Sequence, residues 1–147
     1  MQNTVTTKTY VAASITHAAA KALIDASFVS AKELGIGVTI AITDAAGNLK
    51  TFERADNAPF LTVDVAIDKA WTSASFGLPT HIWNELIRNP ELTPLGQRPR
   101  LLAIGGGYPI IENGKVVGGI GVSGGNVAQD REIAEYALKS LGFEIAG

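Results

Sequence analysis

Three features are missing from the sequence, and each absence excludes a class of function. No cysteine is present, which excludes disulfides, cysteine-ligated zinc, iron–sulfur clusters and thiol nucleophiles. Twelve Lys and Arg residues against fourteen Asp and Glu give a formal net charge of −2 without a basic block, so we expect no nucleic-acid partner. No stretch reaches the ~18 apolar residues of a membrane-spanning helix, so we expect no membrane partner.

The start of the chain and the common catalytic motifs give two further expectations. No cationic segment followed by an apolar run and a cleavage site opens the sequence at residues 1–4, so we expect a cytoplasmic location. Neither a Gly-x-Ser-x-Gly elbow nor a His-Glu-x-x-His helix is present, which leaves the common hydrolase and protease mechanisms without support. The length of 147 residues predicts a single domain over residues 1–147.

Glycine, by contrast, is abundant and unevenly placed. Nine of the sixteen glycines lie between Gly105 and Gly125. Glycine weakens a strand unless another backbone has to come close to it. The glycine spacing within Gly118–Val122 therefore predicts that another backbone or helix packs against this strand.

Local patterns predict an α+β fold. Asn113-Gly114 between two apolar runs is a strong hairpin signal, and Asp44 is expected to form the turn of an earlier hairpin. Asn126 with Gln129 three positions later predicts a capping box. Because hairpins join neighbouring antiparallel strands, we expect a mostly antiparallel sheet of about five strands. The expected strands are residues 37–43, 49–52, 100–104, 108–112 and 115–122, and the expected helices begin near Ser14, Val63, Thr80 and Asn126.

Several segments in a fixed order resemble one protein family. They are Ile42–Leu49, Phe52–Pro59, Ala66–Thr72, Phe76–Thr80, Gly105–Ile110 and Val117–Gly125, followed by Gln129-Asp130. Together they resemble the HbpS/GlcG family, which also contains the C-terminal domain of PduO-type proteins and is described as haem-binding or haem-degrading. The resemblance covers residues 15–141.

This resemblance implies a fold, an assembly and a ligand. The implied fold is a profilin-like α/β/α arrangement, in which helices flank an antiparallel sheet. The implied assembly is a homo-oligomer, often a dimer-based tetramer or octamer. The implied ligand is a small molecule, with haem as the best single expectation and haem degradation as a further one.

Two imidazoles, His17 and His81, are the candidate ligands for haem iron or another metal. His17 lies one residue from the apolar face of the first expected helix, which also suits an exposed or interface residue. His81 follows Thr80 in the first turn of a short expected helix and lies near Trp83, where an imidazole can face a pocket.

Charged residues in the matching segments are candidates for binding an acidic group. Lys69 could bind a carboxylate, such as a haem propionate or an acid substrate, and Asp68 could pair with Lys69 or with Arg54. The planar guanidinium of Arg54 suits a bidentate carboxylate. A solvated helix face and an ordinary surface ion pair explain the same residues without any function.

The sequence leaves open whether the protein is an enzyme. In the haem-binding interpretation, His81 or His17 binds the iron and Arg54 or Lys69 binds the propionates. In a second interpretation, His81, Lys69 and Asp68 are the acid–base residues of a cofactor-free lyase, isomerase or hydrolase with a pocket at a subunit interface. In a third, the chain is a non-catalytic accessory subunit of a catabolic pathway.

Overall fold

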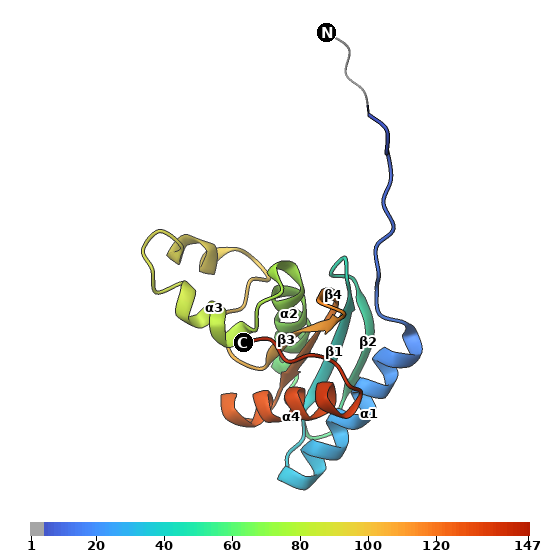
Figure 1. Ribbon diagram of the computed structural model, residues 1–147. Helices are drawn as coiled ribbons and strands as arrows, with labels where there is room; N and C mark the ends of the chain where they lie inside the picture. The colour runs from blue at the N-terminus through green and yellow to red at the C-terminus, as the bar shows by residue number, and fades with distance from the viewer. Residues whose placement is uncertain (1–4) are drawn as a thin grey trace.

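Four antiparallel strands form a sheet in the order β2-β1-β4-β3 (Figure 1). The computed structural model describes residues 5–147, so residues 1–4, which were considered for an export signal, lie outside the described part. Along the chain the elements are α1 (His17–Leu34), β1 (Thr39–Asp44), β2 (Leu49–Arg54), α2 (Leu61–Phe76), α3 (Thr80–Leu86), the 3-10 helix η1 (Thr93–Gln97), β3 (Gly107–Glu112), β4 (Lys115–Ser123) and α4 (Val127–Ser140). The predicted α+β class is confirmed. Within residues 5–147 no helix is both long enough and apolar enough to cross a membrane.

Helices cover both faces of the sheet. Helices α1 and α4 pack on one face, where β1 and β4 present Ile40 and Ile120 to the main hydrophobic core. Helix α2 lies on the other face, where Ala41 of β1 contacts Ala66 and Ala70. This alternation follows from the two-residue period of a strand, and it confirms the expected α/β/α layering.

The sheet has four strands rather than the five predicted, because residues 100–104 form no strand. Pro99 has no backbone N–H, and Arg100 has a φ of 76°, which lies in the left-handed region. The hydroxyl of Thr72 donates to the carbonyl of Arg100 and accepts from the N–H of Leu102, both at 3.0 Å. A side chain of α2 therefore satisfies backbone groups that a strand would have paired.

Glycines line β4 where α2 crosses it. A Cβ at Gly119 would overlap the carbonyl oxygen of Ala70, and a Cβ at Gly121 would overlap that of Ala66. The backbone of α2 thus lies directly on the strand, which confirms the close approach predicted from the glycine spacing. The same approach brings the backbone of Lys69 against Gly107, where β3 begins.

Two of the predicted turn and cap residues are confirmed, and the N-cap of α1 lies two residues later than predicted. The Asn126–Gln129 capping box is present, and Asp44 accepts two backbone N–H groups of its own turn. Helix α1 is capped by Thr16 rather than by Ser14. The hydroxyl of Ser14 instead accepts a backbone N–H from the turn between β1 and β2.

Candidate functional site

His81 lies in the wall of a cavity formed by α3, the loop before β3, and α4. The cavity has a volume of about 310 Å³, and its polar side chains are His81, Asn84, Glu85, Arg88 and Arg131. The first four come at helical spacing from α3 and the residues just after it, and Arg131 comes from α4. Ligand pockets commonly measure roughly 300–1,000 Å³, so this cavity suits a small molecule or one edge of a larger one.

Two guanidinium groups determine the charge of this cavity. Arg88 donates to the side-chain oxygen of Asn84 at 3.3 Å, and Nε of Arg131 donates to the hydroxyl of Tyr108 at 3.5 Å. In the described part of the chain, neither arginine takes part in an ion pair. Glu85 is the one acidic residue in the lining, so positive charge is in excess and an acidic ligand group is favoured.

Gly105 allows the two sides of the cavity to come together. A Cβ at this position would lie 2.7 Å from a methyl carbon of Val127 and 3.3 Å from both the Cβ of His81 and the Cδ of Arg131. Any larger residue would push α3 and α4 apart. The glycine therefore keeps His81 and Arg131 next to the same small space.

His81 is a partly buried and electrically neutral member of this site. Its ring is tilted against Tyr108 with the centroids 5.6 Å apart, and its Nδ1 is enclosed without a hydrogen-bond partner among residues 5–147. Burial lowers the pKa of His81 and Arg131 lowers it further, while Glu135 and Glu85 oppose the shift. A neutral imidazole offers one donor and one acceptor to a ligand.

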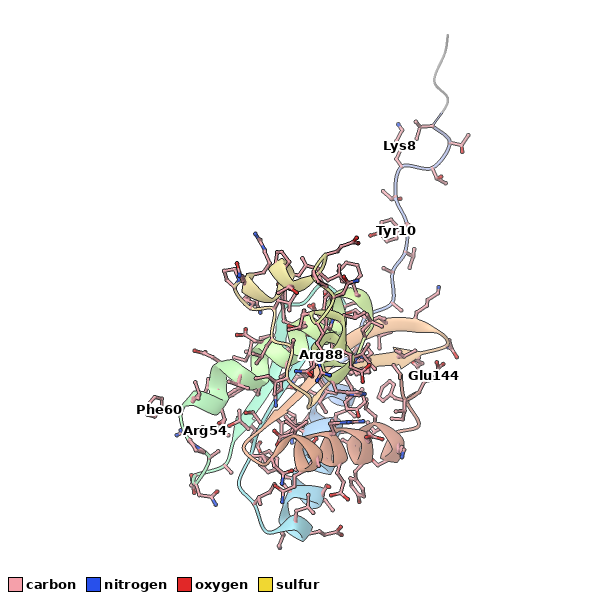
Figure 2. The ribbon with its side chains drawn as sticks, turned by 90° about the vertical axis from the view of Figure 1, so that its left-hand side faces the viewer. Lys8, Tyr10, Arg54, Phe60, Arg88 and Glu144 are labelled. Carbon is pink, nitrogen blue, oxygen red and sulfur yellow. The ribbon has the colours of Figure 1, made fainter. Side chains whose placement is uncertain are left out.

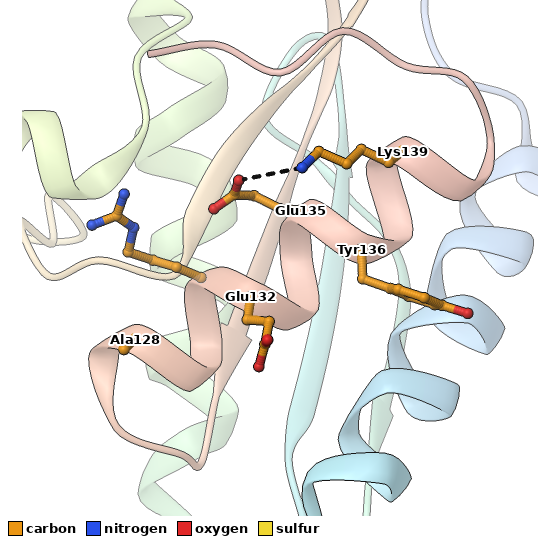
Figure 3. Close-up of a pocket in the computed structure, with 6 residues that line it drawn as sticks. Ala128, Glu132, Glu135, Tyr136 and Lys139 are labelled. Atoms are coloured by element: carbon orange, nitrogen blue, oxygen red, sulfur yellow. Dashed lines mark ion pairs between the residues drawn. The ribbon is translucent and has the colours of Figure 1, made fainter.

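The outer face of α4 carries a second, more open hollow of about 390 Å³ (Figure 3). Arg131 lines both this hollow and the cavity at His81. The remaining lining is mixed in charge, because Glu135 and Lys139 form an ion pair at 3.9 Å across it. Glu135 also accepts the hydroxyl of Tyr108 at 2.8 Å, and burial raises the pKa of Tyr108 to about 12, so this hydroxyl keeps its proton.

Lys69 does not line the cavity at His81. It is only 2% exposed, and its ammonium group donates to the carbonyl of Val122 at 2.8 Å and to the carboxylate of Asp130 at 3.2 Å. Burial lowers the pKa of Lys69 and raises that of Asp130, and in each case the charge of the partner opposes the effect. Lys69 was expected to bind the carboxylate of a ligand, but it binds that of Asp130 in α4 instead.

Asp68 pairs with Arg100 at 3.5 Å, and not with Lys69 or Arg54. The guanidinium of Arg100 also lies 4.5 Å from the centre of the Trp71 ring, an arrangement typical of a cation–π contact. These contacts hold the loop before β3 against α2. Burial raises the pKa of Asp68, and Arg100 partly offsets this shift.

Arg54 lies on a different side of the molecule from His81. It is exposed at the end of β2 and donates to the carbonyl of Ala58 at 3.3 Å. Because β2 and β3 are the two edges of the sheet, three strand spacings of about 4.8 Å, or roughly 14 Å, separate Arg54 from the β3 side. Figure 2 accordingly shows Arg54 near Phe60 and well apart from Arg88.

His17 is exposed in the first turn of α1. A third cavity, of about 280 Å³, adjoins the start of α1; His17 is not among its lining residues, of which the apolar ones are Ala13, Ile15, Ala19, Val117, Leu141 and Phe143. Within residues 5–147 no group of three or more His, Cys, Asp or Glu side chains could hold a metal ion together. The two imidazoles therefore lie apart, with His81 in a cavity lined by two arginines and His17 exposed at the start of α1.

Arg88 and Arg131 are not among the residues predicted from the sequence. Arg88 stands seven residues after His81, which places both on one side of a helix, and this spacing could have been noticed. Arg131 follows a matching segment directly, but nothing local indicates that α4 meets α3. That contact depends on the tertiary fold.

Comparisons with known proteins agree with this architecture. A family model described as "Haem degrading protein HbpS-like" matches residues 15–139. An uncharacterized 15.0 kDa protein from the dhaT-dhaS intergenic region of Citrobacter freundii is 38% identical over 130 residues, which cover 86% of this chain and 91% of that protein.

Solved structures show the same relationship. The crystal structure of HbpS is 29% identical, has a TM-score of 0.86, and the match covers 92% of this chain and 95% of HbpS. The crystal structure of a PduOC:haem complex is 28% identical, has a TM-score of 0.84, and the match covers 91% of this chain and 99% of PduOC. The chain therefore belongs to the HbpS-like family.

Proposed function

We propose that this protein binds haem, with an imidazole as the iron ligand. The observation that carries this proposal is the likeness to PduOC in a structure that contains haem, over 91% of this chain. The family name points to the same ligand and adds haem degradation as a proposed activity. With no cysteine in the chain, histidine is the most suitable side chain to ligate the iron.

His17 is the better placed of the two imidazoles. Its exposed position lets a large planar ligand approach without displacing protein atoms. The mainly apolar cavity at the start of α1, lined by Thr16 next to His17 in the chain and by Ala19 of the same helix, is the proposed surface for the macrocycle. Lys21 lies one helical turn further on and is exposed, so it can leave its partner Asp25 for a haem propionate.

His81 is the alternative iron ligand. Its cavity of about 310 Å³ could accept one edge of a haem, whose propionates would then meet Arg88 and Arg131. Two residues were predicted from the sequence to bind a haem propionate. Of these, Lys69 already binds Asp130, and Arg54 could contact only a ligand that extends to β2. We therefore assign His81 second place.

A hemin titration followed by absorbance tests the proposal. We expect a saturable Soret shift, with an affinity at least about tenfold weaker in His17→Ala and nearly unchanged in His81→Ala, because one ligand supplies most of the iron bond. Weaker binding in His81→Ala with nearly unchanged binding in His17→Ala would identify His81 as the iron ligand. A flat titration of the unaltered protein would refute haem binding and favour an accessory role. Loss of Soret absorbance over time with both a reductant and dioxygen present, and no loss without dioxygen, would indicate oxidative haem degradation.

A further inference from the structure

The cavity at His81 differs from a haem site in its chemistry. Its lining combines two guanidinium groups, a side-chain amide and a neutral imidazole, with Glu85 as the one acidic side chain. Its apolar lining side chains are Ile104 and Val127, whereas the cavity at the start of α1 has the mainly apolar lining that a haem macrocycle needs. The cavity at His81 is therefore better suited to a small polar ligand.

We propose that this cavity binds a short carboxylic acid that also carries a hydroxyl or a second carboxyl group. Arg88 and Arg131 approach from α3 and α4, so a carboxylate between them meets donors from both sides. The proposal does not depend on haem binding.

The arginines are oriented for this task and remain available. Arg131 uses Nε for Tyr108, and Arg88 uses one terminal nitrogen for Asn84, which leaves the other N–H groups of each guanidinium free for a ligand. Tyr108 is itself fixed by its hydrogen bond to Glu135 at 2.8 Å. Neither arginine lies within ion-pair distance of an acidic side chain in residues 5–147, so both can pair with a ligand carboxylate.

His81 lines the same cavity and is the candidate contact for the second polar group. Its Nδ1 is enclosed without a hydrogen bond in the described part of the chain, and a turn of the ring toward a ligand hydroxyl would relieve that cost. Because the ring is neutral, it can bind a hydroxyl without repelling the arginines. The close walls at Gly105 and the volume of about 310 Å³ suit a small ligand.

Calorimetric titration of the haem-free protein with malate tests the site. We expect saturable binding that weakens at least about tenfold in Arg88→Met and in Arg131→Met, because each change removes a charged donor. Lys115→Met is the matched control, because it also removes one positive charge. Lys115 lies at the other end of β4, about 20 Å along the strand from Gly121, which pairs with Gly107 next to the cavity. Malamide, the uncharged diamide, should not bind.

Because Arg88 is exposed, its substitution should leave the fold intact, so weaker malate binding in Arg88→Met would not be a result of unfolding. Absence of malate binding, retention of malamide binding, or equal weakening by Lys115→Met would overturn the proposal. The same titration in His17→Ala should match the unaltered protein. A failure of haem binding would therefore leave this test unaffected, and a failure here would leave haem binding at His17 unaffected.

Discussion

The buried ion pair between Lys69 and Asp130 stabilises the packing of α2 and α4 near the candidate site. Its two side chains are 2% and 4% exposed, and they join α2 to the first turn of α4. Removal of one partner leaves the other charge buried without compensation. The pair therefore acts as an internal support rather than as a contact to a ligand.

We predict that Lys69→Met lowers the free energy of unfolding by about 3–5 kcal/mol, because Asp130 then lies buried without its cation. Urea denaturation measures this. Lys21→Met is the control, since the Lys21–Asp25 pair is 64% exposed on both sides and should change stability by only about 0–1 kcal/mol. A cost in Lys69→Met no larger than that of the control would contradict the assigned role.

The buried imidazole of His81 predicts a pH dependence of stability. Its pKa in the folded state lies below the unfolded value of 6.5, so the folded protein binds fewer protons and loses stability as the pH falls below 6.5. The melting temperature should drop between pH 7.5 and 5.5, and His81→Gln should reduce that drop. His17→Gln, which removes an exposed imidazole, is the control. An undiminished drop in His81→Gln would argue against this explanation.

At the residue level, the sequence predicts which side chains are candidates for the site better than it predicts the residues that they contact. His81 was expected to face a pocket, and it lines one. Lys69 was expected either on a solvated face or at a ligand, and its real partner stands 61 positions away in the chain. Local pattern cannot reveal such a partner, because the contact exists only after α2 and α4 have packed around β4.

At the level of elements, the glycines of β4 set how closely α2 can pack. We predict that Gly121→Ala destabilises the fold by at least about 1–3 kcal/mol, because the new methyl group would meet the backbone of Ala66, which cannot move aside as a side chain can. Chemical denaturation measures the change. Gly96→Ala is the matched control, since the added Cβ would meet only Ile87, at 3.5 Å, and should be nearly neutral. Equal effects would refute the close approach.

Elements with local signals were predicted well. The Asn113-Gly114 hairpin and the Asn126 capping box depend on neighbours within a few residues, and both are present. The predicted strand at residues 100–104 fails because Thr72, some thirty residues away, takes its backbone hydrogen bonds. An apolar run alone does not distinguish a strand from a loop that lies on a helix.

On the scale of the whole molecule, several exposed apolar side chains belong to the edge strand β2 and to the start of α2. Phe60 and Leu61, at the start of α2, are 86% and 69% exposed. Pairing of Ala41 with Phe52 and of Thr43 with Leu49 places both β2 residues on the face that α2 only partly covers. Exposed apolar side chains that lie close together are typical of protein interfaces.

We therefore expect the homo-oligomer implied by the family resemblance to use this surface. Sedimentation velocity should show a species heavier than one chain. The double variant Phe60→Lys, Leu61→Lys should raise its dissociation constant at least about tenfold, because charges would enter the interface. Val29→Lys tests an exposed apolar residue of α1 instead and should have little effect. A single-chain species in the unaltered protein at all concentrations would rule the assembly out.

The two edges of the sheet are not equivalent. Ile111 of β3 is bridged to Glu144, so an arriving strand would have to displace that contact, whereas within residues 5–147 β2 is hydrogen-bonded only to β1. Two chains that met edge to edge through β2 would join their sheets into one continuous eight-stranded layer around a two-fold axis. In such a pair each chain contributes the same edge, so the contact between the two β2 strands is closed and symmetric.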